Sequence, residues 1–272
     1  MKIKISDDFD PIKIIRSGQC FRPTVISDDT YRFISGEKIV YIRSLDENVY
    51  DLSCNENELG YWKDYFDLDL DYKALREKVP KNDAFLSKCA EHGKGLRILK
   101  QDKWEMLVSF IISQRKSIPA IRTSIEKLCF NFGERIKDDK FGDRALFSFP
   151  TSEALAKASK EELDMCSLGY RSEYVMDAAR LVAGDIINLN ELDGYDNEKL
   201  FESLKTVKGV GDKVANCVML FAYHRLSRAP VDTWIAKIID KFYDGIDPFP
   251  AYGEYAGLMQ QYMFFEATDN GL

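Results

Sequence analysis

The sequence lacks the cysteine and histidine patterns that would indicate a metal site. Its six cysteines are scattered without a CxxC pair, which argues against both a disulfide framework and a cysteine-bound zinc ion. Only two histidines, His92 and His224, are present, so a histidine-based site is not expected either. We therefore expect no metal ion and no other bound cofactor.

Long apolar runs are missing as well. No segment is apolar over the length that a membrane-spanning helix needs, and residues 1–8 contain no hydrophobic region of the kind found in a secretory signal peptide. We therefore expect a cytoplasmic enzyme.

An excess of positive charge, the usual sign of a nucleic-acid-binding protein, is also absent. The formal net charge is −7, which counts against nucleic-acid binding as a general prior. Acidic side chains concentrate in residues 46–71, a face that we expect to point away from any DNA. The basic side chains gather near two expected helix starts: Arg115, Lys116 and Arg122 near one, and Lys205, Lys208 and Lys213 near the other. Binding would then rest on few phosphate contacts, supported by backbone amides.

The 272 residues are enough to bury a substantial core in one large or two smaller domains. Residues 31–34 and 39–42 alternate like strands on either side of Ser35-Gly36, which predicts a β-hairpin. From Trp104 onward the apolar residues repeat with a helical period. The sequence therefore predicts an α+β chain, with an N-terminal β-rich α+β domain (1–100) followed by a helical domain (101–272).

The pattern of apolar residues and helix-ending residues also predicts individual elements. We expect a helix over residues 61–75, two long helices after residue 104 that are broken near Pro119, a helix over 159–169 ended by Gly169, helices over 172–186 and 233–242, a loop over 244–252 and a closing helix over 254–266.

One stretch predicts two helices joined by a tight glycine turn. Residues 197–207 are helical in pattern, Gly209-Val210-Gly211 follows, and an apolar run begins at Val214. Glycines allow positive φ and close approach of another backbone. Amides at the start of the second helix point outward and carry the positive end of its dipole, which suits a phosphate group.

Lys213 and Asp232 are the candidate catalytic residues. Lys213 lies in the first turn of the second helix, where the dipole and any burial favour the neutral amine, so it is a plausible nucleophile. Pro230 disfavours helix at the residue before it, which places Asp232 just after a break, at an expected helix N-cap.

These residues resemble a known family. The segment 208–232 is similar to the helix-hairpin-helix and Gly/Pro…Asp signature of the HhH-GPD base-excision DNA glycosylases, and within that superfamily to the 8-oxoguanine DNA glycosylases. The similarity extends in family order through residues 17–22 (SGQCFR), 110–129, 168–171 (LGYR) and 256–264. It implies an N-terminal antiparallel β-sheet domain followed by a mostly α-helical glycosylase region containing the hairpin, and damaged double-stranded DNA as the partner of a monomeric enzyme.

The resemblance also implies chemical roles. The Lys213 amine would attack C1′, displace the base and form a Schiff base that permits strand cleavage by β-elimination, with Asp232 stabilising the positive charge that develops. The extruded base would meet the carbonyl of Gly18, stack between Cys217 and Phe264, and present its Watson–Crick edge to Gln260. A carbonyl accepts the N7–H of 8-oxoguanine but leaves the N7 acceptor of guanine unpaired.

The implied DNA contacts lie elsewhere on the chain. Tyr170 matches the wedge and Arg171 the arginine that meets the orphaned opposite base, while Gly209, Gly211 and Trp234 match phosphate contacts. The chain departs from the family at Arg115 and Ala120, because eukaryotic members have an asparagine and an arginine there for reading the opposite cytosine. We therefore expect relaxed discrimination of the opposite base.

Two alternatives remain open at this point. A related glycosylase for another lesion, such as an alkylated base, would share the hairpin, although members of that kind mostly work without the lysine. A non-catalytic helix-hairpin-helix protein would use Lys213 only as a phosphate contact.

Overall fold

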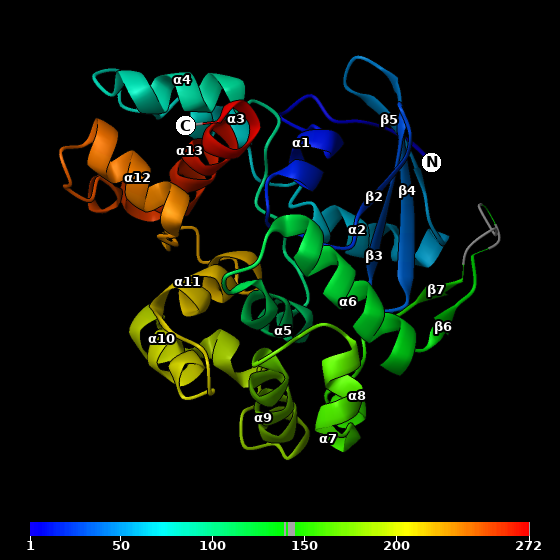
Figure 1. Ribbon diagram of the computed structural model, residues 1–272. Helices are drawn as coiled ribbons and strands as arrows, with labels where there is room; N and C mark the ends of the chain where they lie inside the picture. The colour runs from blue at the N-terminus through cyan, green and yellow to red at the C-terminus, as the bar shows by residue number, and fades with distance from the viewer. Residues whose placement is uncertain (139, 141–144, 272) are drawn as a thin grey trace.

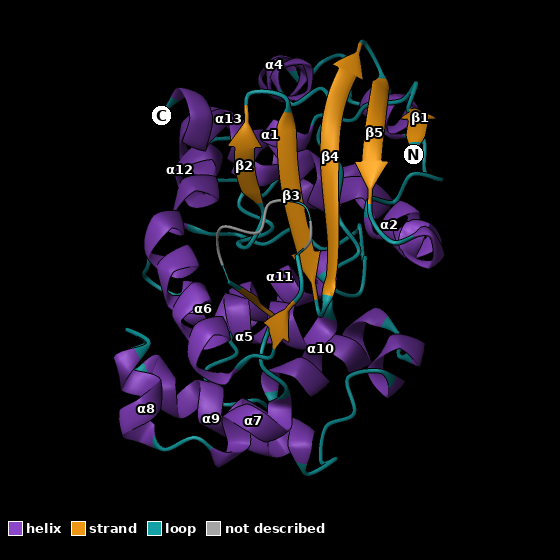
Figure 2. Cartoon of the chain, turned by 90° about the vertical axis from the view of Figure 1, so that its right-hand side faces the viewer, coloured by secondary structure: helices purple, strands orange, loops and turns teal. Residues whose placement is uncertain are grey.

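The computed structural model describes residues 1–138, 140 and 145–271, and its N-terminal part is a five-stranded antiparallel sheet (Figure 2). The strands are β1 (Lys2–Lys4), β2 (Thr24–Ser27), β3 (Thr30–Ser35), β4 (Lys38–Asp46) and β5 (Val49–Ser53), in the order β1-β5-β4-β3-β2. The predicted hairpin is confirmed, because Ile34 pairs with Ile39 across the turn between β3 and β4. Two short strands, β6 (Arg135–Ile136) and β7 (Leu146–Phe147), form a separate pair that the sequence analysis did not predict.

Helices make up most of the remaining chain. They are α1 (Pro11–Arg16), α2 (Leu59–Tyr65), α3 (Tyr72–Arg76), α4 (Ala84–His92), α5 (Lys103–Ser113), α6 (Ile118–Phe132), α7 (Ser152–Lys157), α8 (Lys160–Met165), α9 (Arg171–Ala183), α10 (Asn197–Lys205), α11 (Asp212–Phe221), α12 (Thr233–Phe242) and α13 (Ala256–Asn270), with 3₁₀ turns at η1 (Glu56–Glu58), η2 (Glu191–Gly194) and η3 (Phe249–Tyr255). Among the described residues, none of these helices has the length and apolarity required to cross a membrane.

The elements form three groups (Figure 1). The sheet buries one face against α1 and α2, where Ile14 and Trp62 pack with Phe33 in one apolar cluster. The helices α5–α11 form the second group, and α4, α12 and α13 form the third, which lies next to α1. The predicted α+β class, with an N-terminal antiparallel sheet followed by a helical hairpin-containing region, is confirmed.

The third group joins the two ends of the chain. The ring of Phe85 in α4 stacks on Phe242 of α12 with centroids 3.8 Å apart, and Lys88 pairs with Glu266 of α13 at 2.7 Å. Thus α4, which precedes residue 100 in sequence, packs with helices from the end of the chain. The division of the chain into two domains, residues 1–100 and 101–272, therefore stays a prediction.

The helix predicted over residues 61–75 is wrong as a single element. Helix α2 ends at Tyr65, the chain turns through Asp67 with a φ of +49°, and α3 begins only at Tyr72. The turn is imposed by buried polar contacts, because the carbonyl of Asp67 accepts from Arg97 Nη1 at 2.6 Å and its carboxylate accepts from the Tyr72 hydroxyl at 2.8 Å.

Other helix boundaries also differ from the prediction. The break between α5 and α6 covers residues 114–117, and Pro119 lies in the first turn of α6, where a missing amide hydrogen is harmless. Helix α8 ends at Met165, before Gly169, and the chain leaves the helical conformation at Ser167, which has a φ of +61° and whose carbonyl accepts from Lys116 and from Ser124 of α6. The predicted loop over 244–252 contains the start of η3, and α13 begins two residues later than expected.

A buried charge cluster connects the segment after Gly18 to the helical region. Arg22 lies between Glu105 of α5, 3.9 Å away, and Glu126 of α6, 3.5 Å away, and donates to the carbonyl of Phe147 in β7. Burial raises the pKa of Glu105 to about 7, although Arg22 opposes the shift. The folded protein therefore holds a proton on Glu105 more tightly than the unfolded chain does.

This shift predicts a specific pH dependence of stability. The raised pKa of Glu105 adds to the free energy of unfolding. This addition is fully present below about pH 4.5 and is lost as the pH rises through about 7. We expect Glu105→Gln to be more stable relative to wild type at pH 8 than at pH 5, by up to about 3 kcal/mol. Urea unfolding of both proteins at the two pH values measures this difference, and an unchanged difference would show that Arg22 compensates the buried carboxylate fully.

Candidate active site

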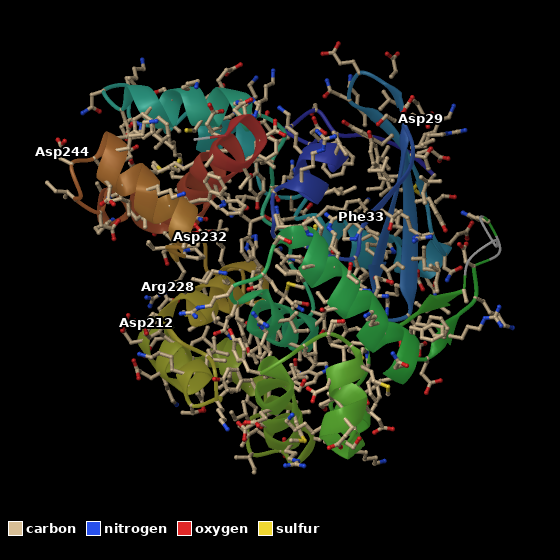
Figure 3. All side chains as sticks on the ribbon, viewed as in Figure 1. Asp29, Phe33, Asp212, Arg228, Asp232 and Asp244 are labelled. Atoms are coloured by element: carbon tan, nitrogen blue, oxygen red, sulfur yellow. The ribbon has the colours of Figure 1, made fainter. Side chains whose placement is uncertain are left out.

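A cavity of about 650 Å³ lies where the first turns of α11 and α12 meet the end of α5 and the face of α13. A recess of about 50 Å³ shares part of this lining and extends it inward. Together they are lined by eight of the predicted site residues: Gly18, Arg115, Lys213, Cys217, Asp232, Trp234, Gln260 and Phe264. Figure 3 shows Asp232 at the start of α12, between the groups formed by α12–α13 and α10–α11. Residues from both ends of the sequence thus converge on one site.

Lys213 is the second residue of α11 and faces this cavity from the hairpin. Its Nζ lies 3.5 Å from Ser113 Oγ and 5.4 Å from the ring centroid of Phe110, both on α5. The side chain is half-buried, and none of the ion pairs among the described residues involves its Nζ. The amine is therefore held at the cavity wall without a carboxylate that would fix it as a structural cation.

The two glycines of the hairpin turn serve different purposes. Gly209 has a φ of +83°, and a Cβ there would lie 2.3 Å from the ring of Tyr174, so only glycine fits. Gly211 is extended, with φ of −94°, and a Cβ there would meet no atom within 4 Å. Gly209 therefore uses the positive φ that glycine allows, whereas Gly211 does not. Gly211 is the N-cap of α11 and leaves the approach to its first-turn amides open.

Asp232 is the N-cap of α12, as the sequence predicts. Its Oδ1 accepts from the amides of Trp234 at 3.0 Å and Ile235 at 2.9 Å. These bonds fix one carboxylate oxygen, and the residue also lines the cavity. Capping and a role in the cavity are therefore compatible in the same side chain.

Gly18 lies opposite α13 in a rigid loop. Its φ is +74°, and a Cβ would lie 2.8 Å from Cε1 of Phe264, so the phenyl ring packs directly on the glycine backbone. The next residue, Gln19, is fully buried, and its amide donates to the carbonyl of Arg97 at 2.8 Å and accepts from Leu99 N at 2.9 Å. The side-chain amide of Gln19 thus ties the loop that carries Gly18 to the backbone of Arg97 and Leu99.

Cys217 and Gln260 line the inner recess. Cys217 lies one turn after Lys213 on α11, and burial raises the pKa of its thiol, an effect that the neighbouring Lys213 opposes. Gln260 is 3% exposed and lies one turn before Phe264 on α13. A neutral thiol, a phenyl ring and an amide therefore surround the space beside Lys213.

The structure adds a second amine that sequence reasoning did not assign to the site. Lys116 lines the cavity, and burial lowers its pKa, with Arg171 and Lys127 adding to the effect. Its Nζ is already committed, because it donates to Ser124 Oγ and to the carbonyl of Ser167. No spacing in the sequence indicates this contact, since the partners come from α6 and the loop after α8.

Arg115 and Trp234 lie at the outer part of the cavity. Arg115 is exposed and has a φ of +51°, an uncommon conformation for a residue with a side chain. Trp234 is half-buried in the first turn of α12, with Lys237 Nζ 5.0 Å from its ring centroid. Both side chains can reach the rim of the cavity rather than its inner recess.

Tyr170 and Arg171 do not line the cavity. Tyr170 is 51% exposed, whereas Arg171 is 6% exposed and lies with its guanidinium 4.4 Å from the Tyr170 ring centroid. Arg171 donates from Nε and Nη2 to the carbonyl of Gln114 and from Nη1 to that of Leu168. Gln114 in turn donates to the carbonyl of Gly209 at 3.1 Å. Gln114 therefore links the hairpin turn to Arg171, a connection that the sequence did not reveal.

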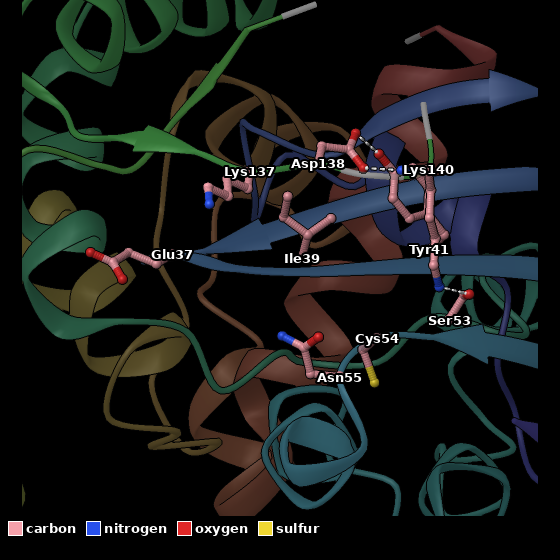
Figure 4. A pocket seen from close by; sticks show the side chains of 9 residues that line it. All are labelled: Glu37, Ile39, Tyr41, Ser53, Cys54, Asn55, Lys137, Asp138 and Lys140. Carbon is pink, nitrogen blue, oxygen red and sulfur yellow. Dashed lines mark hydrogen bonds between the residues drawn. The ribbon is translucent and has the colours of Figure 1, made fainter. Parts of the chain in front are cut away.

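A separate hollow of about 130 Å³ lies between β4, β5 and the segment after β6 (Figure 4). Its polar groups bind one another: the Tyr41 hydroxyl donates to Asp138, and Lys140 donates to Ser53. It shares no lining residue with the cavity of Lys213. The cavity between α11, α12 and α13 is therefore the better candidate for an active site.

Two family models match the chain. A family model described as the 8-oxoguanine DNA glycosylase N-terminal domain matches residues 2–107. A second, described as the HhH-GPD superfamily base excision DNA repair protein, matches residues 108–255. The second match covers the hairpin, Lys213 and Asp232.

Individual proteins are similar over most of their length. The N-glycosylase/DNA lyase of Saccharomyces cerevisiae is 29% identical over 276 residues, which cover 88% of this chain and 72% of the yeast protein. The structure of MBOgg1 with a low-affinity DNA ligand has a TM-score of 0.93 and 32% identity, covering 100% of this chain and 96% of that chain. The 8-oxoguanine glycosylase/lyase of Clostridium acetobutylicum, solved with double-stranded DNA containing cytosine opposite to 8-oxoG, has a TM-score of 0.92 and 30% identity, covering 100% and 99% of the two chains.

The cap formed by Asp232 predicts different effects for two substitutions. Asp232→Ala removes the acceptor for the amides of Trp234 and Ile235 and should lower the free energy of unfolding by about 1 kcal/mol. Asp232→Asn keeps an acceptor oxygen and should cost only a few tenths of that amount. Thermal or urea unfolding of the two variants measures the effect, and equal stabilities would contradict the capping role.

Proposed function

The chain belongs to the HhH-GPD superfamily of base excision DNA repair proteins, and we propose that it removes 8-oxoguanine from duplex DNA through attack by Lys213. Its activity is that of a bifunctional 8-oxoguanine DNA glycosylase and AP lyase. The assignment of residues to the chemical steps is the proposal, and one observation carries it. A single cavity brings together a lysine that forms no ion pair with the described residues, a capping aspartate, and a recess lined by a thiol, a phenyl ring and an amide.

The chemistry begins with extrusion of the damaged nucleotide, because C1′ cannot be reached inside the stacked duplex. The unprotonated Lys213 amine attacks C1′, the bond from C1′ to N9 breaks, and the base leaves with the electron pair. Loss of a proton from nitrogen and opening of the sugar ring give a Schiff base between C1′ and Nζ. Removal of a proton from C2′ then expels the 3′ phosphate, which cleaves the strand.

Asp232 stabilises the positive charge that develops on the sugar during the first step. Its Oδ1 is held by two amides of α12, so the carboxylate is oriented before the substrate arrives. A preorganised charge of this kind needs no rearrangement during the reaction.

The base is recognised inside the recess. The carbonyl of Gly18 accepts the N7–H that distinguishes 8-oxoguanine from guanine, Cys217 and Phe264 stack on the two faces, and Gln260 meets the Watson–Crick edge. The phenyl ring of Phe264 packs against Gly18 in the free protein, so it must shift when the base enters. The anchored backbone around Gln19 supports a fixed position for the Gly18 carbonyl.

The DNA backbone is proposed to bind across the first turns of α11 and α12. The open space beside Gly211 gives phosphates access to the amides of α11, and Gly209 permits the turn. Trp234 lies in the first turn of α12, where its indole N–H could donate to a phosphate oxygen. Tyr170, which is half exposed, fits the role of a wedge.

We propose a monomer as the working form. A cytoplasmic location stays a prediction from the sequence. The proposed lysine chemistry separates this enzyme from a non-catalytic hairpin protein and from a glycosylase that works without a lysine.

Replacing the nucleophile tests the central step. Lys213→Gln should keep binding to an 8-oxoguanine duplex but lose base excision, strand cleavage and covalent trapping by borohydride, because an amide cannot form a Schiff base. The matched variant Lys116→Gln changes the other amine of the cavity and should still be trapped. Near wild-type strand cleavage by Lys213→Gln, with loss of trapping in Lys116→Gln, would reverse the assignment.

The base opposite the lesion is proposed to be read only weakly. Ala120 offers no hydrogen-bond donor, and Arg115 is exposed and longer than the asparagine of eukaryotic members. Arg171, the remaining candidate, already donates to the carbonyls of Gln114 and Leu168. Reading a cytosine would require Arg171 to give up these bonds, which offsets part of the gain.

We expect excision of 8-oxoguanine opposite adenine, guanine or thymine to be little slower than opposite cytosine. A good bidentate contact is worth about 1–3 kcal/mol of discrimination, so its loss reduces the preference by roughly tenfold to a hundredfold. Single-turnover excision from four duplexes that differ only in this base measures the preference. The variant Ala120→Arg, which restores a donor, should favour cytosine more than wild type does. A cytosine preference of a hundredfold or more in wild type would show that Arg115 and Arg171 suffice.

A further inference from the structure

Two adjacent glutamines of α13 line the inner recess of the site. Gln260 is 3% exposed and Gln261 is 4% exposed, and both belong to the recess that also contains Lys213 and Cys217. Phe264 follows them by four and three positions, so both amides lie about one turn before the phenyl ring on the same side of the helix. A base that stacks on Phe264 would therefore meet both side chains.

The hydrogen bonds of this pair are incomplete. Gln261 Nε2 donates to Gln260 Oε1 at 3.1 Å, which orients the amide of Gln260. Gln261 Oε1 is buried and accepts no hydrogen bond from the described part of the chain. Among the buried side-chain atoms there that lack a hydrogen-bond partner, it alone belongs to a residue that lines the cavity or its recess. A buried carbonyl without a donor costs stability, so its presence in a binding recess indicates a ligand that supplies the donor.

We propose that Gln261 Oε1 accepts a hydrogen bond from the exocyclic 2-amino group of the extruded base, which makes Gln261 a specificity-determining residue. The proposal rests on the proposed excision of 8-oxoguanine. A carboxamide oxygen can only accept, and the 2-amino group of a guanine-type base can only donate to it. Bases of the adenine or hypoxanthine type lack this group and offer the oxygen no donor at that position, although hypoxanthine keeps its N1–H. The carbonyl of Gly18 thus selects the oxidised form of the purine, and Gln261 selects the guanine type.

The orientation of the pair agrees with a guanine edge. The side-chain oxygen of Gln260 accepts a hydrogen bond from Gln261, so the amide nitrogen of Gln260 is available to donate to O6 of the base. The oxygen of Gln261 supplies an acceptor for the donor at the other end of the same edge. One donor and one acceptor are therefore presented in fixed relation by two neighbouring residues.

The test compares two substrates and two enzymes. The base 8-oxohypoxanthine differs from 8-oxoguanine only in lacking the 2-amino group. Gln261→Met removes the amide with little change of volume. For each enzyme, the single-turnover excision rate from an 8-oxoguanine duplex is divided by the rate from the matching 8-oxohypoxanthine duplex. This ratio should be about tenfold to a hundredfold larger for wild type than for Gln261→Met, because an unpaired buried acceptor disfavours the base without the donor. Differences in how easily the two bases leave the duplex affect both enzymes equally and cancel.

A control and a second measurement separate recognition from a structural role. Ser109 carries a buried hydroxyl without a partner among the described residues but lines neither cavity, so Ser109→Ala should leave the ratio unchanged. The melting temperature of Gln261→Met should stay close to that of wild type, because the substitution removes an unpaired buried oxygen but also the hydrogen bond to Gln260 Oε1. Gln261→Leu provides an independent variant with a shorter apolar side chain.

Equal ratios in wild type and both Gln261 variants would overturn the proposal, even if the variants excise both bases more slowly. That outcome would mean that Gln261 serves only to orient Gln260. Failure of wild type to excise 8-oxoguanine at all would instead refute the proposed function, and with it the inference.

Discussion

The close contact at Gly257 determines how the three parts of the active site come together. Its amide donates to the carbonyl of Leu226 at 2.7 Å, and a Cβ there would lie 2.5 Å from the carbonyl of Arg228 and 2.6 Å from Leu220. The start of α13 therefore rests directly on the end of α11 and on the segment that leads to α12. Gln260 and Phe264 follow within two turns and reach the recess beside Lys213. A side chain at residue 257 would separate α13 from Lys213 and Asp232.

The N-terminal part of the chain supplies the wall of the cavity at Gly18, and a second buried contact holds that wall in place. Arg97 is fully buried and donates to the carbonyls of Asp8 and Asp67, each at 2.6 Å, and its own carbonyl accepts from Gln19. The guanidinium thus joins the N-terminal segment to the turn after α2, and the backbone carbonyl of Arg97 holds the loop that carries Gly18. Removing it would leave several buried acceptors unpaired, a far larger cost than the loss of a surface ion pair. The segment that carries Gly18 is consequently anchored to the core of the molecule.

Sequence reasoning succeeded where the causes are local. The glycine turn at Gly209, the position of Lys213 in a first helical turn and the cap at Asp232 follow from residues a few positions apart, and the structure has all three. It failed where contacts between residues far apart in the sequence determine the structure. Arg97 binds the carbonyl of Asp67 where the expected helix breaks. The hydrogen bonds of Lys116 to Ser167 and of Arg171 to Gln114 are long-range contacts of the same kind, which the sequence does not reveal. The orphaned oxygen of Gln261 could not be predicted at all, because it depends on the partners that a buried side chain lacks.

The most direct test of the account is to locate the covalent bond itself. Wild-type protein would be trapped with borohydride on a duplex containing one 8-oxoguanine, digested with protease and nuclease, and the modified peptide sequenced by mass spectrometry. The account predicts one adduct, on Nζ of Lys213, at the start of α11. An adduct on Lys116, the other lysine that lines the cavity, or the absence of any adduct during active base excision, would contradict it.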